Sequence, residues 1–205
     1  MLQTFLSWRC QGVFFLVGQI LAGWILVGFL PVKAETSGGV VISGFQVSGG
    51  SGRTNEEYVE LYNSSSEPVD ISGWRLAKLT KTGALGSWTY LMSGFAAGTT
   101  LPGHTFALAV HNDAASLFGG DWQYGSSTLA EDNSVVLLNT GGDVVDLVGW
   151  GQAVHFTGQP LAIAGAGSWA RELGVDSALG AFAQTEALPR QGRASDFLGV
   201  ESSGT

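Results

Sequence analysis

Cysteine is almost absent from this sequence, since Cys10 is the only one among its 205 residues. The chain after that position therefore has no internal disulfide, no thiolate metal site and no cysteine nucleophile. If this part of the chain is exported, its core alone must stabilise the fold. Hydrophobic residues make up 45% of the sequence, which is enough to form such a core.

Charged residues are also scarce, at 13% of the chain, against roughly 25% in an average globular protein. The formal net charge is −8, and it becomes −10 without residues 1–34, which contain Arg9 and Lys33 but no acid. Proteins that bind nucleic acids place many Lys and Arg side chains against phosphates. The acidic balance therefore argues against a nucleic-acid partner.

The longest apolar run lies near the N-terminus, over residues 13–30, and follows the basic Arg9. Small or branched residues precede a cleavage point after Ala34, so residues 1–34 are predicted to be a signal peptide. The run is longer than most signal peptides need and is just long enough to cross a bilayer, so an uncleaved membrane anchor is the alternative. Both interpretations predict export and leave residues 35–39 as a linker.

The rest of the chain does not show the apolar spacing of an amphipathic helix three turns long. It contains short apolar runs between turn residues, in a sequence with 31 glycines and 5 prolines. In YVELYN, Val59 and Leu61 alternate with residues of a more polar face, which is typical of a half-buried strand. Seven or eight such strands predict an all-β sandwich over residues 40–174. A loosely packed or flexible extension is predicted over residues 175–205.

The clearest hairpin is SVVLLNTGGDVVDLVGW, in which residues 135–138 and 144–148 flank a glycine turn. Its first strand has no polar alternation, so we expect that strand to be central and buried on both faces. Residues 63–70 are predicted to form a hairpin loop. Residues 111–133 are predicted to form a long loop with one helical turn near residues 114–118.

Two segments of the chain share the form Asp-x-x-Gly-Trp, namely DISGW at residues 70–74 and DLVGW at residues 146–150. Duplication would explain the pair. The favoured interpretation is that both are the same local solution, a turn or bulge at glycine followed by an anchoring tryptophan.

Several of these motifs follow one another in an order that resembles a known family. VELYN and VDISGWRL come first, LPGHTFALA and NSVVLLNTGGDVVDLVGWG follow, and SWARE forms the last predicted strand. Together they resemble the lamin tail domain, an immunoglobulin-like β-sandwich, over about residues 40–172. The resemblance implies structural roles for its motif residues, which are Val59, Glu60, Leu61, Asn63, Asp70, Gly73, Trp74, Asp146, Gly149, Trp150 and Arg171.

The resemblance also implies binding and tethering rather than catalysis. In bacteria such domains are commonly exported, alone or attached to secreted or membrane hydrolases. We therefore expect an exported, non-enzymatic module of the cell envelope, without a cofactor, whose partner is a protein or a glycan. Membrane contact is expected only through residues 13–30, if these are not cleaved. The alternatives are a secreted hydrolase or its accessory domain, and a membrane-anchored structural protein.

Three carboxylates, Glu56, Glu57 and Glu60, could supply the acid and base of a glycosidase. A hydrolytic pair needs a cleft, however, and a strand face of a sandwich is usually convex and solvated. The favoured interpretation is therefore that these side chains are charges on an exposed strand face.

The histidines, His104, His111 and His155, show no metal-ligand spacing. Oxygen ligands for calcium are present in predicted loops, but their spacing does not match an EF-hand, so no metal site is predicted. These oxygen ligands are Asp121, Glu131, Asp132 and Asp143. A nucleophile elbow of the form G-x-S-x-G is also absent.

Aromatic residues in the predicted loop GGDWQYGSS are the candidate binding surface, formed by Trp122 and Tyr124 with Asp121. Aromatic side chains in loops commonly contact sugars, peptides or protein partners. The alternative is that they fold back as a lid on the core. Asn63 also begins the glycosylation sequon Asn-Ser-Ser.

Overall fold

A computed structural model describes residues 39–157, 161, 168–171, 182–185 and 192–193. The predicted signal peptide or anchor and nearly all of the predicted linker lie outside the described residues. Within the described part of the chain, no helix is long and apolar enough to cross a bilayer.

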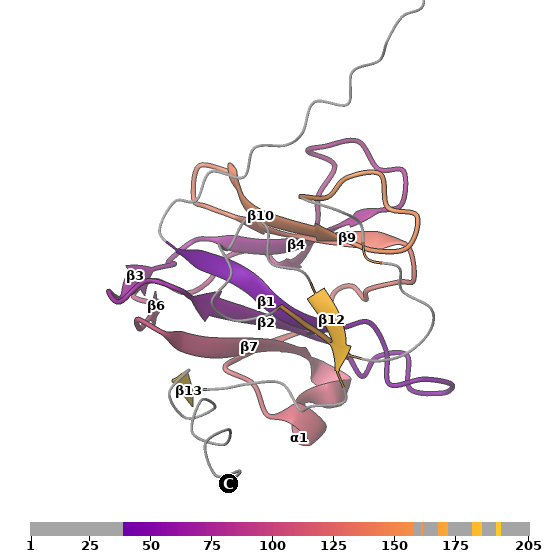
Figure 1. The fold of residues 1–205 in the computed structure, drawn as a ribbon, viewed down its shortest axis with the longest axis horizontal. Helices are drawn as coiled ribbons and strands as arrows, with labels where there is room; N and C mark the ends of the chain where they lie inside the picture. The colour runs from indigo at the N-terminus through magenta and orange to yellow at the C-terminus, as the bar shows by residue number, and fades with distance from the viewer. Residues whose placement is uncertain (1–38, 158–160, 162–167, 172–181, 186–191, 194–205) are drawn as a thin grey trace, which may run out of the picture. The chain divides into compact units, whose positions relative to one another are not determined.

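The described strands form two packed sheets and a short two-stranded ladder (Figure 1). The larger sheet has the order β12-β11-β1-β2-β7-β13, and β8 pairs in parallel with β7. The smaller sheet has the order β10-β9-β4-β5, and the ladder joins β3 to β6. All strand pairs within the sheets other than β7–β8 are antiparallel.

The larger sheet contains β1 (Val40–Gln46), β2 (Tyr58–Asn63), β7 (Thr105–His111), β8 (Trp122–Tyr124), β11 (Ser168–Arg171), β12 (Phe182–Thr185) and β13 (Gly192–Arg193). The smaller sheet contains β4 (Arg75–Thr80), β5 (Thr89–Met92), β9 (Asn133–Leu138) and β10 (Val144–Gly149). The ladder contains β3 (Val69–Asp70) and β6 (Thr100–Leu101), and a helical turn follows β7 as η1 (Asn112–Ala114) and α1 (Ala115–Phe118).

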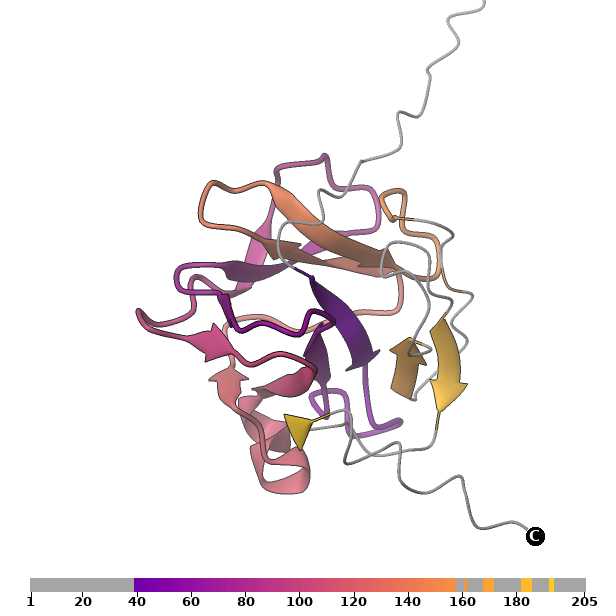
Figure 2. The same cartoon turned by 60° about the vertical axis from the view of Figure 1, so that its left-hand side comes forward.

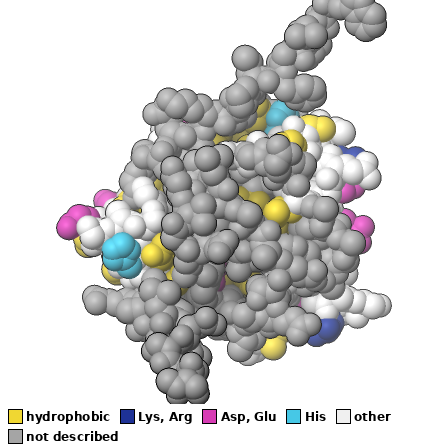
Figure 3. Space-filling model, viewed as in Figure 1, with side chains coloured by type: hydrophobic (Ala, Val, Ile, Leu, Met, Phe, Trp, Pro, Cys, Tyr) yellow, Lys and Arg dark blue, Asp and Glu magenta, His cyan; other side chains and the backbone are white. Residues whose placement is uncertain are grey.

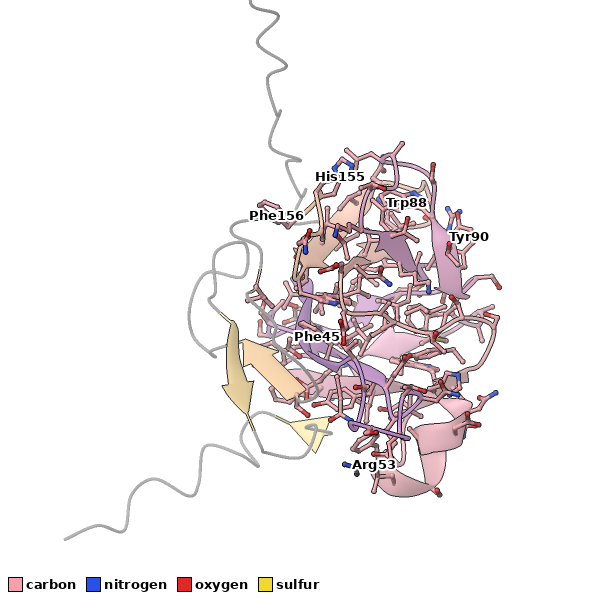
Figure 4. All side chains as sticks on the ribbon, turned by 90° about the vertical axis from the view of Figure 1, so that its right-hand side faces the viewer. Phe45, Arg53, Trp88, Tyr90, His155 and Phe156 are labelled. Carbon is pink, nitrogen blue, oxygen red and sulfur yellow. The ribbon has the colours of Figure 1, made fainter. Side chains whose placement is uncertain are left out.

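The main core lies between the two sheets, where alternate residues of each strand meet. Phe45 of β1 stacks on Trp150 with ring centroids 4.8 Å apart, and both side chains are fully buried. Figure 4 shows Phe45 in the interior of the domain. Aromatic pairs at this separation add to the stabilisation that comes from burial alone.

Strand β9 is central and buried on both faces, as its unbroken apolar run predicts. Val135 and Leu137 face the main core, whereas Val136 and Leu138 belong to a second apolar cluster on the other side of the sheet. The predicted hairpin is confirmed by the pairing of β9 with β10, and the predicted helical turn is confirmed by α1, which ends at Phe118.

The second face of β2 was expected to be solvated, and this expectation is wrong. Tyr58 is buried in a third cluster, and Phe118 of α1 packs edge-on against it at 5.1 Å. Tyr62 stacks on Phe106 of β7 at 4.5 Å. The helical turn α1, which follows β7, packs against Tyr58 on this face of the larger sheet. The alternation of residues within β2 does not indicate that another segment covers its second face.

Residues 63–70 do not form the predicted hairpin loop. Strand β2 belongs to the larger sheet and β4 to the smaller one, and between them β3 pairs with β6. The segment therefore carries the chain from one sheet to the other. Such a crossing and a hairpin have similar turn residues, so composition alone does not separate them.

Strand pairing continues beyond residue 174, the predicted end of the sandwich. Strand β12 pairs with β11, and β13 pairs with β7. Figure 2 shows the first of these pairs beside β1 at the margin of the sheet. The predicted extension thus contributes two strands, whose short length gave too few residues for a periodic signal.

Candidate functional site

The polar group with the most unusual environment is Glu57, which lies one residue before β2 and is fully buried. Its two carboxylate oxygens accept the backbone N–H of Leu129 at 3.0 and 2.9 Å. The hydroxyl of Tyr124 donates to one of them at 3.5 Å. These bonds tie the segment after β8 to the entry of β2, at one end of the sandwich.

Burial raises the pKa of Glu57 to about 7, although the Leu129 N–H, the charge of Lys78 and the Tyr124 hydroxyl each lower it. Lys78 reaches this cluster from β4 of the opposite sheet, and its amine donates to the carbonyl of Thr128. Burial lowers the pKa of Lys78 while the charge of Glu57 raises it. Burial first, and then the charge of Glu57, hold the pKa of Tyr124 well above its usual value.

His111 completes the surroundings of this cluster. Its ring meets that of Tyr124 edge-on at 5.6 Å, and its Nδ1 accepts the backbone N–H of Asp113 at 3.2 Å. We name Glu57, Lys78, Tyr124 and His111 the Glu57 cluster. A carboxyl group with a pKa near 7 can exchange a proton near neutral pH. Because Glu57 is buried and already hydrogen-bonded to the backbone, the arrangement fits a structural role, in which Glu57 holds two segments together, better than an open catalytic site.

The three candidate carboxylates do not share an exposed face, so that prediction is wrong. Glu56 forms an ion pair with Arg53 at 3.2 Å. Glu60 is buried and accepts the hydroxyl of Ser43 at 2.7 Å. Glu57 points into the cluster described above. The partners of Glu57 and Glu60 come from other segments of the chain, so the local sequence carried no signal that these two side chains are buried.

The candidate surface is not a loop throughout, because Trp122 and Tyr124 lie in strand β8, which Asp121 directly precedes. Tyr124 is buried, and Trp122 packs edge-on against Phe95 at 4.6 Å. Asp121 is exposed, and its carboxylate accepts the backbone N–H of Leu108 at 2.8 Å. The aromatic rings fold back on the core, as the alternative interpretation had it, because parallel pairing with β7 directs them inward.

Two carboxylates of the family motif hold an irregularity in β1. Its register shifts between Ile42 and Gly44, which leaves Ser43 as an extra residue opposite β2. Asp146 accepts the backbone N–H of Ile42 at 2.8 Å from the other sheet, and Glu60 accepts the Ser43 hydroxyl. A bulge disturbs the pairing of the backbone ladder, so Asp146 supplies an acceptor for a backbone N–H beside it, and Glu60 holds the side chain of the extra residue.

Asn63 holds the crossing between the sheets. Its amide nitrogen donates to the carbonyls of Glu67, Leu101 and Pro102 at 2.8, 2.9 and 3.2 Å. Its side-chain oxygen accepts the N–H of Ser65 at 3.0 Å. Since Asn63 is fully buried and its amide is fully engaged, the glycosylation sequon is not available in the folded domain.

The two Asp-x-x-Gly-Trp segments are different local solutions, contrary to the favoured interpretation. Gly73 has a φ of +70° in a turn, where a residue with a Cβ is strained. Gly149 instead ends strand β10, where an added Cβ would lie 2.7 Å from the carbonyl oxygen of His155. The tryptophans are similar only in being buried: Trp74 joins the main core, and the indole of Trp150 also donates to Ala130 at 2.7 Å.

The remaining motif residues fit the same structural pattern. Val59 and Leu61 lie in the main core. Asp70 accepts the N–H of Ser72 at 2.8 Å, and hydrogen bonds from Ser72 lower the pKa of its carboxyl group. The backbone of Arg171 ends β11, opposite β12.

The candidate metal ligands are dispersed. Among the residues that the structure describes, no group of three or more His, Cys, Asp or Glu side chains could hold a metal ion. Asp132 accepts the N–H of Gln152 at 2.8 Å, and Asp143 accepts the amide of Asn139 at 3.0 Å. The Nδ1 atom of His104 lies 3.5 Å from the hydroxyl of Tyr62, so this histidine also contacts a protein side chain.

Sequence reasoning missed Lys78 as a partner of the Glu57 cluster. Lys78 lies on β4 of the smaller sheet, whereas Glu57 directly precedes β2 of the larger sheet, and Lys78 alternates with apolar neighbours as any strand lysine would. The hydrogen bonds that close the cluster come from residues about 70 positions away from Glu57. A single sequence carries no signal for such a contact.

Two packed, mainly antiparallel sheets around one apolar core define an immunoglobulin-like β-sandwich. The family model of the lamin tail domain matches residues 33–152. The chain therefore belongs to the lamin tail domain family. No curated protein matches the chain.

Proposed function

We propose that this protein is an exported, non-catalytic binding or tethering module of the cell envelope, with a protein or a glycan as partner. The observation that carries the proposal is the use of its buried polar side chains. Asp146, Asn63 and Glu57 each bind backbone groups of the domain itself. Side chains that position their own backbone stabilise a scaffold, and binding surfaces are then carried by its loops.

Export is supported by residues 1–34, whose apolar run and cleavage pattern are typical of a signal peptide. The test is to express the full chain in a bacterium, fractionate the cells and determine the N-terminus by mass spectrometry. A protein that begins at Glu35 in the exported soluble fraction, or an intact chain in the membrane fraction, agrees with export. An intact chain in the cytoplasmic fraction would overturn it.

A secreted hydrolase is the second candidate, because Glu57 has a pKa near 7 beside Lys78 and Tyr124. The conservative variant Glu57→Gln keeps the size of the side chain and removes its proton exchange. The purified protein and the variant should both be inactive on glycan, peptide and phosphoester substrates. Hydrolysis by the unchanged protein that is lost in Glu57→Gln would favour the enzyme.

A further inference from the structure

Residues 125–132 connect β8 of the larger sheet to β9 of the smaller sheet, and we name them the strap. Within the strap only Leu129 is buried, and its side chain belongs to the main core between the sheets. Ser126 and Glu131 are exposed, and Figure 3 shows acidic side chains at the right-hand margin of the domain, on the side where Figure 1 draws β9. The strap therefore closes one end of the apolar core beneath a polar outer surface.

One peptide unit of the strap is held from both sides. The N–H of Leu129 donates to the carboxylate of Glu57, which lies at the entry to β2 of the larger sheet. The carbonyl of Thr128, in the same peptide unit, accepts the amine of Lys78 from β4 of the smaller sheet. Because this peptide bond is trans, its N–H and its carbonyl point in opposite directions. Side chains from the two sheets thus hold the strap between them.

The remaining hydrogen bonds of the strap to other segments also depend on side chains. The indole N–H of Trp150 donates to the carbonyl of Ala130 at 2.7 Å, and the hydroxyl of Ser126 donates to the carbonyl of Tyr90 at 3.4 Å. Within the described part of the chain, no hydrogen bond joins the backbone of residues 126–131 to another backbone group. Strands β8 and β9 are instead paired along ladders. A segment held in this way opens at a smaller cost in free energy than the sheets beside it.

The charge on Glu57 opposes the closed position of the strap. With the strap closed, burial raises the pKa of Glu57 to about 7, from 4.5 for a hydrated carboxyl group. Opening withdraws Leu129 and admits water to the carboxylate, so Glu57 ionises at lower pH when the strap is open. Between these pKa values the closed strap retains a proton that the open strap releases. The closed position is therefore most stable at low pH, and it loses stability as the pH rises toward 7.

Titratable groups reach Glu57 from three strands. Burial first, and then the charge of Glu57, hold the pKa of Tyr124 on β8 well above its usual value, so Tyr124 stays neutral. Burial lowers the pKa of Lys78 on β4, whereas the charge of Glu57 raises it. His111 on β7 donates its backbone N–H to the carbonyl of Glu57 at 3.0 Å, and its ring contacts Tyr124. Histidine side chains commonly titrate near neutral pH, so His111 requires its own control.

We propose that the strap opens and closes over this end of the main core while both sheets stay folded, and that ionisation of Glu57 favours the open position. The open strap uncovers a carboxylate beside the apolar site that Leu129 leaves. The inference does not depend on the proposed function, since it concerns contacts within the domain.

Hydrogen exchange of the full chain, followed by mass spectrometry at several pH values between about 5 and 8, tests the proposal. Each rate is divided by the intrinsic rate of an unstructured peptide at the same pH, which gives the opening equilibrium of each segment. This equilibrium should be about a hundredfold or more larger for the strap than for β9, because exchange of β9 requires the sheets to open. For the strap it should also rise about tenfold or more across the pH range.

Variants assign the pH dependence to one group. Glu57→Gln keeps the size of the side chain and lacks its charge, so the opening equilibrium of the strap should no longer change with pH. Glu131→Gln, at an exposed carboxylate of the strap itself, and His111→Gln should each keep the original dependence. Lys78→Met should increase exchange of the strap severalfold at each pH, because the carbonyl of Thr128 loses its donor. Circular dichroism checks that each variant is folded.

Three outcomes would overturn the proposal. The first is exchange of residues 125–132 that is no faster than exchange of β9, and the second is an opening equilibrium that does not change with pH. Both are measured on the original chain and need no variant. The third is an unchanged pH dependence in Glu57→Gln, and its loss in His111→Gln instead would assign the response to the histidine. None of these outcomes affects export, because cell fractionation and the N-terminus test export independently.

Discussion

Glu56 and Glu57 are neighbours in the sequence and lie in opposite environments. Glu56 pairs with the exposed Arg53, whereas Glu57 is enclosed by groups from three distant segments. A surface ion pair of the first kind contributes little to stability. Ionisation of Glu57 costs free energy, because its buried carboxylate lacks the hydration that it would have in water. The Leu129 N–H, Lys78 and Tyr124 replace only part of that hydration.

The stability of the domain should therefore depend on the protonation of Glu57. Its pKa is about 7 in the folded protein and near 4.5 in the unfolded chain. Between these values the folded state holds a proton that the unfolded chain has released, so the free energy of unfolding should fall as the pH rises from about 4.5 to about 7. Glu57→Gln should remove this dependence, and above pH 7 it should be more stable than the original by about 1–3 kcal/mol.

Urea unfolding at several pH values between 5 and 8 measures this effect. Glu131→Gln, at an exposed carboxylate, is the matched control and should keep the original dependence. A pH profile in Glu57→Gln that is identical to the original would assign the effect to another group.

Asn63 gives a second prediction at this scale. In Asn63→Asp a carboxylate would face three carbonyl oxygens instead of donating to them. We expect a loss of about 3–5 kcal/mol at pH 7, because the charge is buried without a donor for one of its oxygens. Thermal unfolding measures it, with Asn112→Asp at an exposed position as control. Equal stability of the two variants would contradict the structural role of Asn63.

At the scale of the elements, β1 and β10 are each interrupted by one extra residue, and one side chain joins the two irregularities. Ser43 is the extra residue in β1, and Val145 is the extra residue in β10. Asp146 directly follows Val145, and its carboxylate accepts the backbone N–H of Ile42, which directly precedes Ser43. The contact links the sheets through a hydrogen bond in addition to the apolar packing between them.

Asp146→Ala should therefore destabilise the domain by about 2–4 kcal/mol, since the N–H of Ile42 would be buried without its acceptor. Asp146→Asn should cost less, because its side-chain oxygen can still accept that bond. Denaturant unfolding of both variants separates the two cases. A loss below about 0.5 kcal/mol in Asp146→Ala would show that the link between the sheets is dispensable.

At the scale of the whole molecule, the larger sheet is completed by strands that lie after the matched family region. The family model ends at residue 152, whereas beyond it β11 pairs with β1, β12 pairs with β11 and β13 pairs with β7. Strand β11 would be an open edge without β12. Exposed edges present unpaired backbone groups to other chains and favour aggregation.

A chain that ends at Gly174 should consequently be less stable and should aggregate more readily than the full chain. A chain that ends at Ser195 keeps β12 and β13 and is the matched control. Thermal unfolding and light scattering at the same protein concentration compare the two. Equal behaviour of both truncated chains would show that pairing by β12 and β13 is not needed.

The sequence by itself determined the β-sandwich, the central position of β9, the β9–β10 hairpin and the family, because these depend on local periodicity, turn residues and short ordered motifs. Only the tertiary structure decided that Glu57 and Glu60 are buried, that Tyr124 faces inward and that residues 63–70 cross between sheets. The physical reason is that burial and electrostatics depend on partners tens of residues away, and the spacing of residues in one strand does not encode which distant segment covers it.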